Sequence, residues 1–250
     1  MAVIAKVYLV LYNVILTLGW SIILVLSVQH LVKKKSHIGL YSSVEKPLQV
    51  FQSAAILEVL HCAIGLVPSS VVLTAFQVAS RLFLTWAIAY SVPQIQDSPG
   101  VTAFILAWSI TEVIRYAFYA FSLLGSLPYF LQWCRYTFFF ILYPIGVTGE
   151  LVSIYSSLRY VSKSGLYSVS MPNAVNFSFD FHLFLIMVML SYIPSNFARE
   201  YENITVLLVL ARPLVSVEFL PPVFRRHFSG KPVVTSLNVS CFLGLRCPGF

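Results

Sequence analysis

Long apolar runs, broken by short polar segments, make up most of this chain. A helix needs about 20 mainly apolar residues to cross the hydrocarbon core of a bilayer, and six stretches reach or approach that length. They predict helices at residues 7–31, 48–67, 71–92, 101–124, 129–155 and 177–193. The pattern therefore predicts an all-α fold, a polytopic bundle of six transmembrane helices in which the sixth is short.

Turn residues separate the predicted helices. A lysine triplet at 33–35 ends the first, and Pro47, after a polar loop through Glu45 and Lys46, is well placed to start the second. Proline or glycine clusters mark the turns at residues 68–70, 93–100 and 125–128, and a loop containing Arg159, Lys163 and Gly165 precedes the sixth helix.

The chain is expected to divide at Pro194, where the sixth helix stops. Residues 1–194 form the predicted transmembrane domain, and residues 195–250 form an irregular tail that we expect to be poorly ordered. Residues 204–223 are apolar, but charges and prolines interrupt them, so a seventh crossing is not expected.

Composition supports a membrane location. Charged residues make up 10% of the chain and hydrophobic residues 58%, with a mean hydropathy of +0.84, whereas a soluble domain carries about 25% charged residues. This composition excludes a soluble enzyme, a nucleic-acid-binding module and a disordered chain. It makes the lipid bilayer an expected partner of the chain. The net charge of +7 is scattered, and the four cysteines form no CxxC pair or other metal-ligand set.

Seven ionisable side chains fall inside predicted membrane helices. A charge at the bilayer centre costs about 2.5 to 3.5 kcal/mol, so each should face the bundle interior and find a partner. Two interpretations follow. In the first, which we favour for Arg81, Glu112 and Arg115, the groups pair with one another and hold helices together. In the second, some of them line a polar pocket. Gln77 lies one turn before Arg81 on the same face. The seven are Glu58, His61, Arg81, Glu112, Arg115, Arg135 and Glu150.

The predicted fifth helix carries a different pattern. Tyr143 and Glu150 are seven residues apart, which places them within about 20° of each other on one helix face. Pro144, Gly146 and Gly149 lie between them, where glycine allows a neighbouring helix or a ligand to come close. A phenol and a carboxyl group on one face can donate and accept protons in acid–base catalysis. Equally, the two side chains could simply bridge to neighbouring helices, and spacing alone leaves both readings open.

A short motif in the second helix is similar to the tyrosine-phosphatase signature HCxxGxxR. The chain reads HCAIGLVPS at residues 61–69, so Pro68 stands where the phosphate-binding arginine is required. A phosphate-binding loop also needs water, and this segment ends a membrane helix. We therefore exclude phosphatase activity.

This proline-substituted motif, with several others in the same order, resembles the very-long-chain (3R)-3-hydroxyacyl-CoA dehydratase family, also called protein-tyrosine-phosphatase-like. The matching stretches are residues 40–48 (LYSSVEKPL), 57–78, 109–124 (SITEVIRYAFYAFSLL), 127–155 and 165–194. The resemblance implies an enzyme of the endoplasmic reticulum membrane, a hydro-lyase that carries out the third step of each fatty-acid elongation cycle. It implies a CoA thioester substrate, no cofactor or metal, and partnership with the elongase, ketoacyl reductase and enoyl reductase.

The resemblance also assigns site residues. It implies Tyr143 and Glu150 as the catalytic pair. The resemblance also places both termini in the cytosol. The basic loops at residues 33–35 and 159–163 lie on the opposite face of the membrane, and by the positive-inside rule that face would be cytosolic. We follow the resemblance. The supporting polar positions that it implies are Glu58, Gln77, Arg81, Glu112, Arg115, Arg135 and Gly146.

The sequence departs from the family pattern after Pro194, where a basic tail would be expected. This departure leaves open the alternative that the chain is an inactive splice-type variant of the enzyme. A second alternative is a non-catalytic membrane scaffold for the elongation enzymes. A transporter would be expected to show an inverted repeat, which the sequence does not display.

Overall fold

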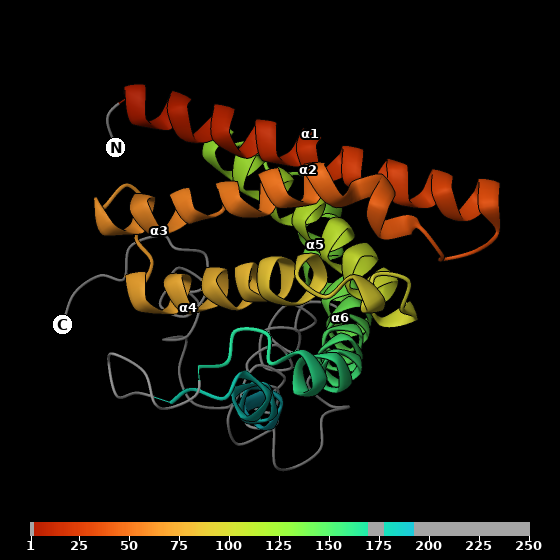
Figure 1. Ribbon diagram of the computed structural model, residues 1–250. Helices are drawn as coiled ribbons and strands as arrows, with labels where there is room; N and C mark the ends of the chain where they lie inside the picture. The colour runs from red at the N-terminus through yellow and green to blue at the C-terminus, as the bar shows by residue number, and fades with distance from the viewer. Residues whose placement is uncertain (1–2, 170–177, 193–250) are drawn as a thin grey trace, which may run out of the picture.

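The computed structural model describes residues 3–169 and 178–192. Apart from an isolated bridge between Val169 and Phe179, the regular structure of these residues is helical. The elements are α1 (Val3–Lys34), α2 (Leu40–Ala54), α3 (Ile56–Ala63), α4 (Val71–Leu82), the π-helix η1 (Phe83–Tyr90), the 3₁₀-helix η2 (Pro93–Ile95), α5 (Pro99–Leu124), α6 (Tyr129–Ser164) and a final helix, Phe181–Tyr192. Figure 1 shows α1 along the top, with α2 and α3 in line below it.

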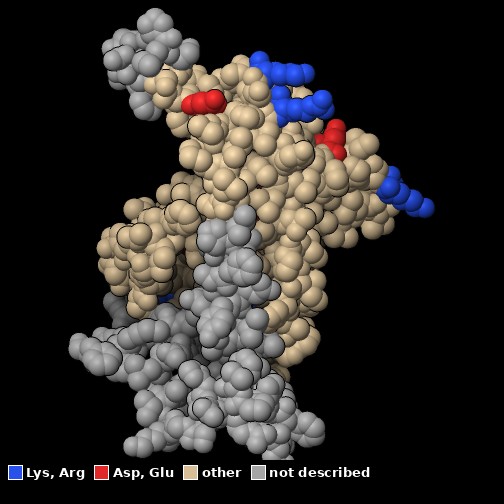
Figure 2. All heavy atoms as spheres, turned by 90° about the horizontal axis from the view of Figure 1, so that it is seen from below, with Lys and Arg blue, Asp and Glu red and all other residues tan. Residues whose placement is uncertain are grey.

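The all-α membrane bundle is confirmed. Within the described ranges, four helical segments are long and apolar enough to cross a membrane: α1, the continuous segment Val71–Tyr90, α5 and α6. The predicted second crossing is divided between α2 and α3, and the predicted sixth is the shorter helix Phe181–Tyr192. In Figure 2 most of the visible charged side chains lie toward one end of the molecule.

The predicted start of the second helix is wrong. Pro47 lies inside α2, which begins at Leu40, so Glu45 and Lys46 are helical rather than part of a loop. The early turns of α2 bury Leu40, Tyr41, Val44 and Leu48 along one face, and this packing outweighs the proline's unfavourable effect on the helix. Gly39, with φ of +77°, makes the turn that precedes the helix.

The predicted end of the fifth helix is also wrong. α6 continues to Ser164, so Arg159 and Lys163 are helical, and Gly165 ends the helix in a left-handed conformation. Ser157 and Val161 are buried in this added segment, so packing extends the helix beyond the apolar run. The predicted starts of α4 at Val71 and α6 at Tyr129 are confirmed. The predicted tail, residues 195–250, lies outside the described residues.

The centre of the bundle is α5, which packs against both α1 and α6. α5 and α6 approach so closely that their backbones touch at two glycines. A Cβ atom added to Gly149 would lie 2.8 Å from the carbonyl oxygen of Gly100 and 2.8 Å from the backbone nitrogen of Phe104. Small residues permit this kind of backbone contact between membrane helices.

We predict that Gly149→Ala destabilises the bundle, because its methyl group must push two backbones apart. Overpacking of this kind costs about 1 to 3 kcal/mol. Gly146→Ala is the matched control on the same helix, since its added Cβ would meet the Ala107 Cβ at an ordinary 3.5 Å. Thermal unfolding in detergent micelles should show a lower midpoint for Gly149→Ala alone. Equal midpoints for the two variants would contradict the packing argument.

Candidate active site

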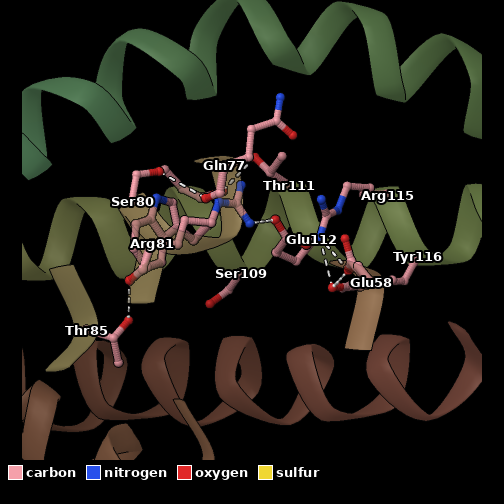
Figure 3. Close-up of polar contacts among 12 residues, drawn as sticks. Glu58, Gln77, Ser80, Arg81, Thr85, Ser109, Thr111, Glu112, Arg115 and Tyr116 are labelled. Carbon is pink, nitrogen blue, oxygen red and sulfur yellow. Dashed lines mark hydrogen bonds and ion pairs between the residues drawn. The ribbon is translucent and has the colours of Figure 1, made fainter. Parts of the chain in front are cut away.

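A fully buried carboxylate, Glu112, lies midway along α5 between two arginines. Arg81 of α4 binds its Oε1 atom, and Nη2 of Arg115, one turn further along α5, lies 2.7 Å from its Oε2 atom. Figure 3 shows Arg81 and Glu112 pointing toward each other. A carboxylate in this position requires such partners, because an isolated buried charge is strongly unfavourable.

The ion pairs continue from Arg115 to the helix before α4. Arg115 donates to Oε1 of Glu58 on α3 at 3.0 Å and to the hydroxyl of Tyr116 at 2.8 Å. The Tyr116 hydroxyl donates in turn to the same Glu58 oxygen (Figure 3). One network of charges therefore joins α3, α4 and α5, as expected for groups that hold membrane helices together.

The remaining polar candidates lie around this network. His61 of α3 contacts the Tyr8 hydroxyl of α1 at 2.9 Å. Gln77 is exposed on α4, and its side chain points away from the Arg81–Glu112 pair in Figure 3. Arg135 of α6 lies over the ring of Phe118, 4.4 Å from its centroid, and donates to the Tyr119 hydroxyl at 3.4 Å.

A cavity of about 200 Å³ lies between α4, α5 and α6, with three arginines in its wall: Arg81, Arg115 and Arg135. Arg81 and Arg115 are paired with the carboxylates of Glu58 and Glu112, whereas Arg135 forms no ion pair within the described part of the chain. The site is therefore suited to a ligand that carries or develops negative charge. The other lining residues are Thr111, Ile114, Cys134, Tyr136, Phe138, Phe139 and Leu142.

Glu150 lies further along α6 and is half-buried. Nε1 of Trp108 on α5 donates to its Oε1 atom at 2.8 Å, and the hydroxyl of Tyr192 donates to its Oε2 atom at 2.7 Å. The carboxylate therefore contacts both neighbouring helices. In the part of the chain that the structure describes, no cluster of three His, Cys, Asp or Glu side chains is present that could hold a metal ion.

Tyr143 lies two turns before Glu150 on the same unbroken helix, which continues through Pro144. Its half-buried ring stacks on Phe139, with 4.8 Å between the ring centroids and 16° between the planes. Phe139 lines the arginine cavity, whereas Tyr143 and Glu150 are themselves not among the residues that line it. Gly146, between the two candidates, is buried at the α5 interface.

Trp108 and Tyr192 are contacts of Glu150 that the sequence did not reveal. Trp108 is 4% exposed, and the Arg81 guanidinium lies 5.4 Å from its ring centroid, so Trp108 touches both the charge network and Glu150. Its spacing from Glu112 and Arg115 (i, i+4, i+7) could have placed it on the same face of α5. Tyr192 lies in the matching stretch 165–194, but no pattern in the sequence singles it out.

Comparison with known proteins agrees with this architecture. Residues 52–203 match the family described as "Protein tyrosine phosphatase-like protein, PTPLA". The mouse (Mus musculus) protein "Very-long-chain (3R)-3-hydroxyacyl-CoA dehydratase 2" is 58% identical over 191 residues, 76% of this chain and 75% of the mouse protein. No solved structure matches the chain.

Two further relatives extend the likeness across kingdoms. "Very-long-chain (3R)-3-hydroxyacyl-CoA dehydratase 1" of dog (Canis lupus familiaris) is 48% identical over 194 residues, 78% of each chain. The Arabidopsis thaliana protein "Very-long-chain (3R)-3-hydroxyacyl-CoA dehydratase PASTICCINO 2" is 46% identical over 197 residues, 78% of this chain and 89% of the plant protein. By these matches the chain belongs to the protein tyrosine phosphatase-like family, and the three relatives described above are all named as dehydratases.

Proposed function

We propose that this protein dehydrates very-long-chain (3R)-3-hydroxyacyl-CoA to trans-2-enoyl-CoA in the endoplasmic reticulum membrane. This is the third step of the fatty-acid elongation cycle, which it would carry out beside an elongase, a ketoacyl reductase and an enoyl reductase. The observation that carries the proposal is the 46–58% identity to curated dehydratases over about three quarters of the chain. The site geometry supports the roles assigned to its residues.

The reaction removes a proton from C2 of the acyl chain and adds a proton to the departing C3 hydroxyl group. Glu150 is the base in this assignment and Tyr143 the proton donor, since a neutral phenol can donate and a carboxylate can accept. Each is expected to contribute about 10² to 10⁴ in rate. Their shared face on α6 allows both to reach an acyl segment that lies along the helix.

The arginine cavity suits the thioester end of the substrate. Loss of the C2 proton moves negative charge onto the thioester oxygen, and fixed cations stabilise charge that develops in this way. Arg115 and Arg135 line the cavity and are the candidates for this role. A cavity of about 200 Å³ is smaller than pockets for drug-sized ligands, about 300 to 1,000 Å³, so the acyl tail must leave it between helices.

The position of the cavity also gives the CoA group a direction of entry. Apart from Arg81 of α4, the lining residues come from the middle of α5 and the first half of α6, the two helices that the turn at residues 125–128 joins. With alternating helices, this turn lies on the same face as the N-terminus. The family resemblance places that face in the cytosol, so CoA phosphates would remain in water at the mouth of the cavity.

Tyr143→Phe and Glu150→Gln should each lower kcat by about 10² to 10⁴, because each removes one proton-transfer group and keeps the side-chain shape. Conversion of 3-hydroxyacyl-CoA to enoyl-CoA by membranes that contain equal amounts of inserted protein measures the effect. Tyr155→Phe, exposed on the same helix, and Glu45→Gln on α2 are the matched controls. Near-normal turnover by either test variant would show that the assignment is wrong.

Glu112→Gln should act mainly on folding, because it leaves the guanidinium groups of Arg81 and Arg115 without their shared carboxylate. Breaking a buried ion pair in this way costs about 3 to 5 kcal/mol. We expect less inserted protein and a lower thermal midpoint in detergent, whereas Glu150→Gln keeps both near the wild-type values. A Glu112→Gln protein as stable as the Glu45→Gln control would contradict the structural role.

A further inference from the structure

The two oxygens of the Glu150 carboxylate face donors of different chemistry. Oε1 accepts from the indole N–H of Trp108, at 2.8 Å, and Oε2 accepts from the Tyr192 hydroxyl, at 2.7 Å. An indole nitrogen only donates, whereas a hydroxyl group can donate or accept. The indole can therefore only donate to Oε1, whereas the hydrogen bond between Oε2 and the Tyr192 hydroxyl can run in either direction.

We propose that Trp108 is a positioning residue whose indole N–H holds Oε1 of Glu150 and so fixes the orientation in which the carboxylate meets the substrate. This inference rests on the proposed function, in which Glu150 is the base. It adds to the site a residue with no ionisable group.

The proton balance of the reaction follows from this assignment. The C2–H bond breaks, its proton bonds to the Glu150 carboxylate, and its electron pair moves onto the thioester group. That electron pair then forms the C2–C3 double bond as the C3–O bond breaks. The departing hydroxyl group takes a proton from Tyr143 and leaves as water. Transfer of the proton on Glu150 back to the Tyr143 phenolate, through that water, restores both groups.

Trp108 is itself held firmly enough to fix the carboxylate. Its side chain is 4% exposed, and the ring of Phe104 packs against it with 4.9 Å between the centroids. The Arg81 guanidinium lies over the indole at 5.4 Å and is itself bound to the buried Glu112. The indole therefore connects the charge network of α4 and α5 to the carboxylate on α6.

The position of Trp108 also follows from the helix contact. The backbone of Phe104, one turn before Trp108, lies against Gly149, the neighbour of Glu150. The carboxylate and the indole are thus fixed by adjacent turns of two touching helices. A displacement of about 1 Å at a catalytic group can lower the rate by on the order of 10²-fold.

The test removes the indole N–H and leaves the rest of the ring in place. Trp108→Phe does this with some loss of volume. Replacement of Trp108 by 3-benzothienyl-alanine, in which sulfur takes the place of the N–H, keeps the ring size and therefore the packing. Trp86→Phe is the matched control, because Trp86 is exposed and its indole donates to Ser53 at 3.2 Å rather than to Glu150.

We expect both Trp108 variants to lower kcat by about 10- to 100-fold in the full-length protein, with KM for 3-hydroxyacyl-CoA unchanged. Trp86→Phe should keep the wild-type kcat. If Trp108→Phe does not insert, the benzothienyl variant decides the question, because its shape is that of tryptophan. A packing role alone predicts wild-type kcat for that variant and would overturn the proposal.

Two other results separate this inference from the proposed function. Wild-type kcat in both Trp108 variants, together with an inactive Glu150→Gln protein, would overturn the role of Trp108 and leave the dehydratase assignment in place. An active Glu150→Gln protein would overturn both. A raised KM with unchanged kcat would place Trp108 in substrate binding, and this also contradicts the proposal.

Discussion

The contact between the backbones of α5 and α6 is the constraint on which the rest of the site depends. Gly100 and Gly149 let the two helices touch, with the would-be Cβ of Gly149 2.8 Å from the opposite backbone. That distance brings Trp108 within hydrogen-bonding reach of Glu150. It also fixes where the early turns of α6, with Arg135 and Tyr143, stand relative to the arginines of α4 and α5. A wider crossing would keep the fold but separate the carboxylate from its donor.

The two arginines bound to the buried Glu112 have a structural and a functional role at once. In lipid an unpaired charge is expensive, so Glu112 requires cations, and it has two of them, Arg81 and Arg115. Both arginines also line the cavity. The same arginines that hold α4 against α5 through Glu112 therefore also present guanidinium groups to the cavity. The two readings of the intramembrane charges, helix pairing and pocket lining, describe one arrangement.

Much of this arrangement was predictable from the sequence, and the reasons for the failures are physical. The apolar runs gave the fold class, and the rarity of charges in lipid pointed to the residues of the network. The boundaries at Pro47 and after residue 155 failed because burial of one helix face outweighed local signals. Trp108 and Tyr192 escaped notice because neither is ionisable, and their importance comes only from what they touch. Trp108, Glu150 and Tyr192 lie on three different helices, and residue spacing along one helix cannot show which residues of another helix it contacts.

Glu150 also shows why a catalytic group can depend on a distant part of the chain. Its Oε2 atom is bound by Tyr192, at the end of the helix Phe181–Tyr192. That helix packs on η1 through rings, with Phe83 5.7 Å from Phe184. The orientation of the Glu150 carboxylate therefore depends on two helices. Oε1 is bound by Trp108 of α5, and Oε2 by Tyr192 of the helix Phe181–Tyr192. Since α5 holds Oε1 through a buried indole, a shift of the last helix would act on the carboxylate through Oε2.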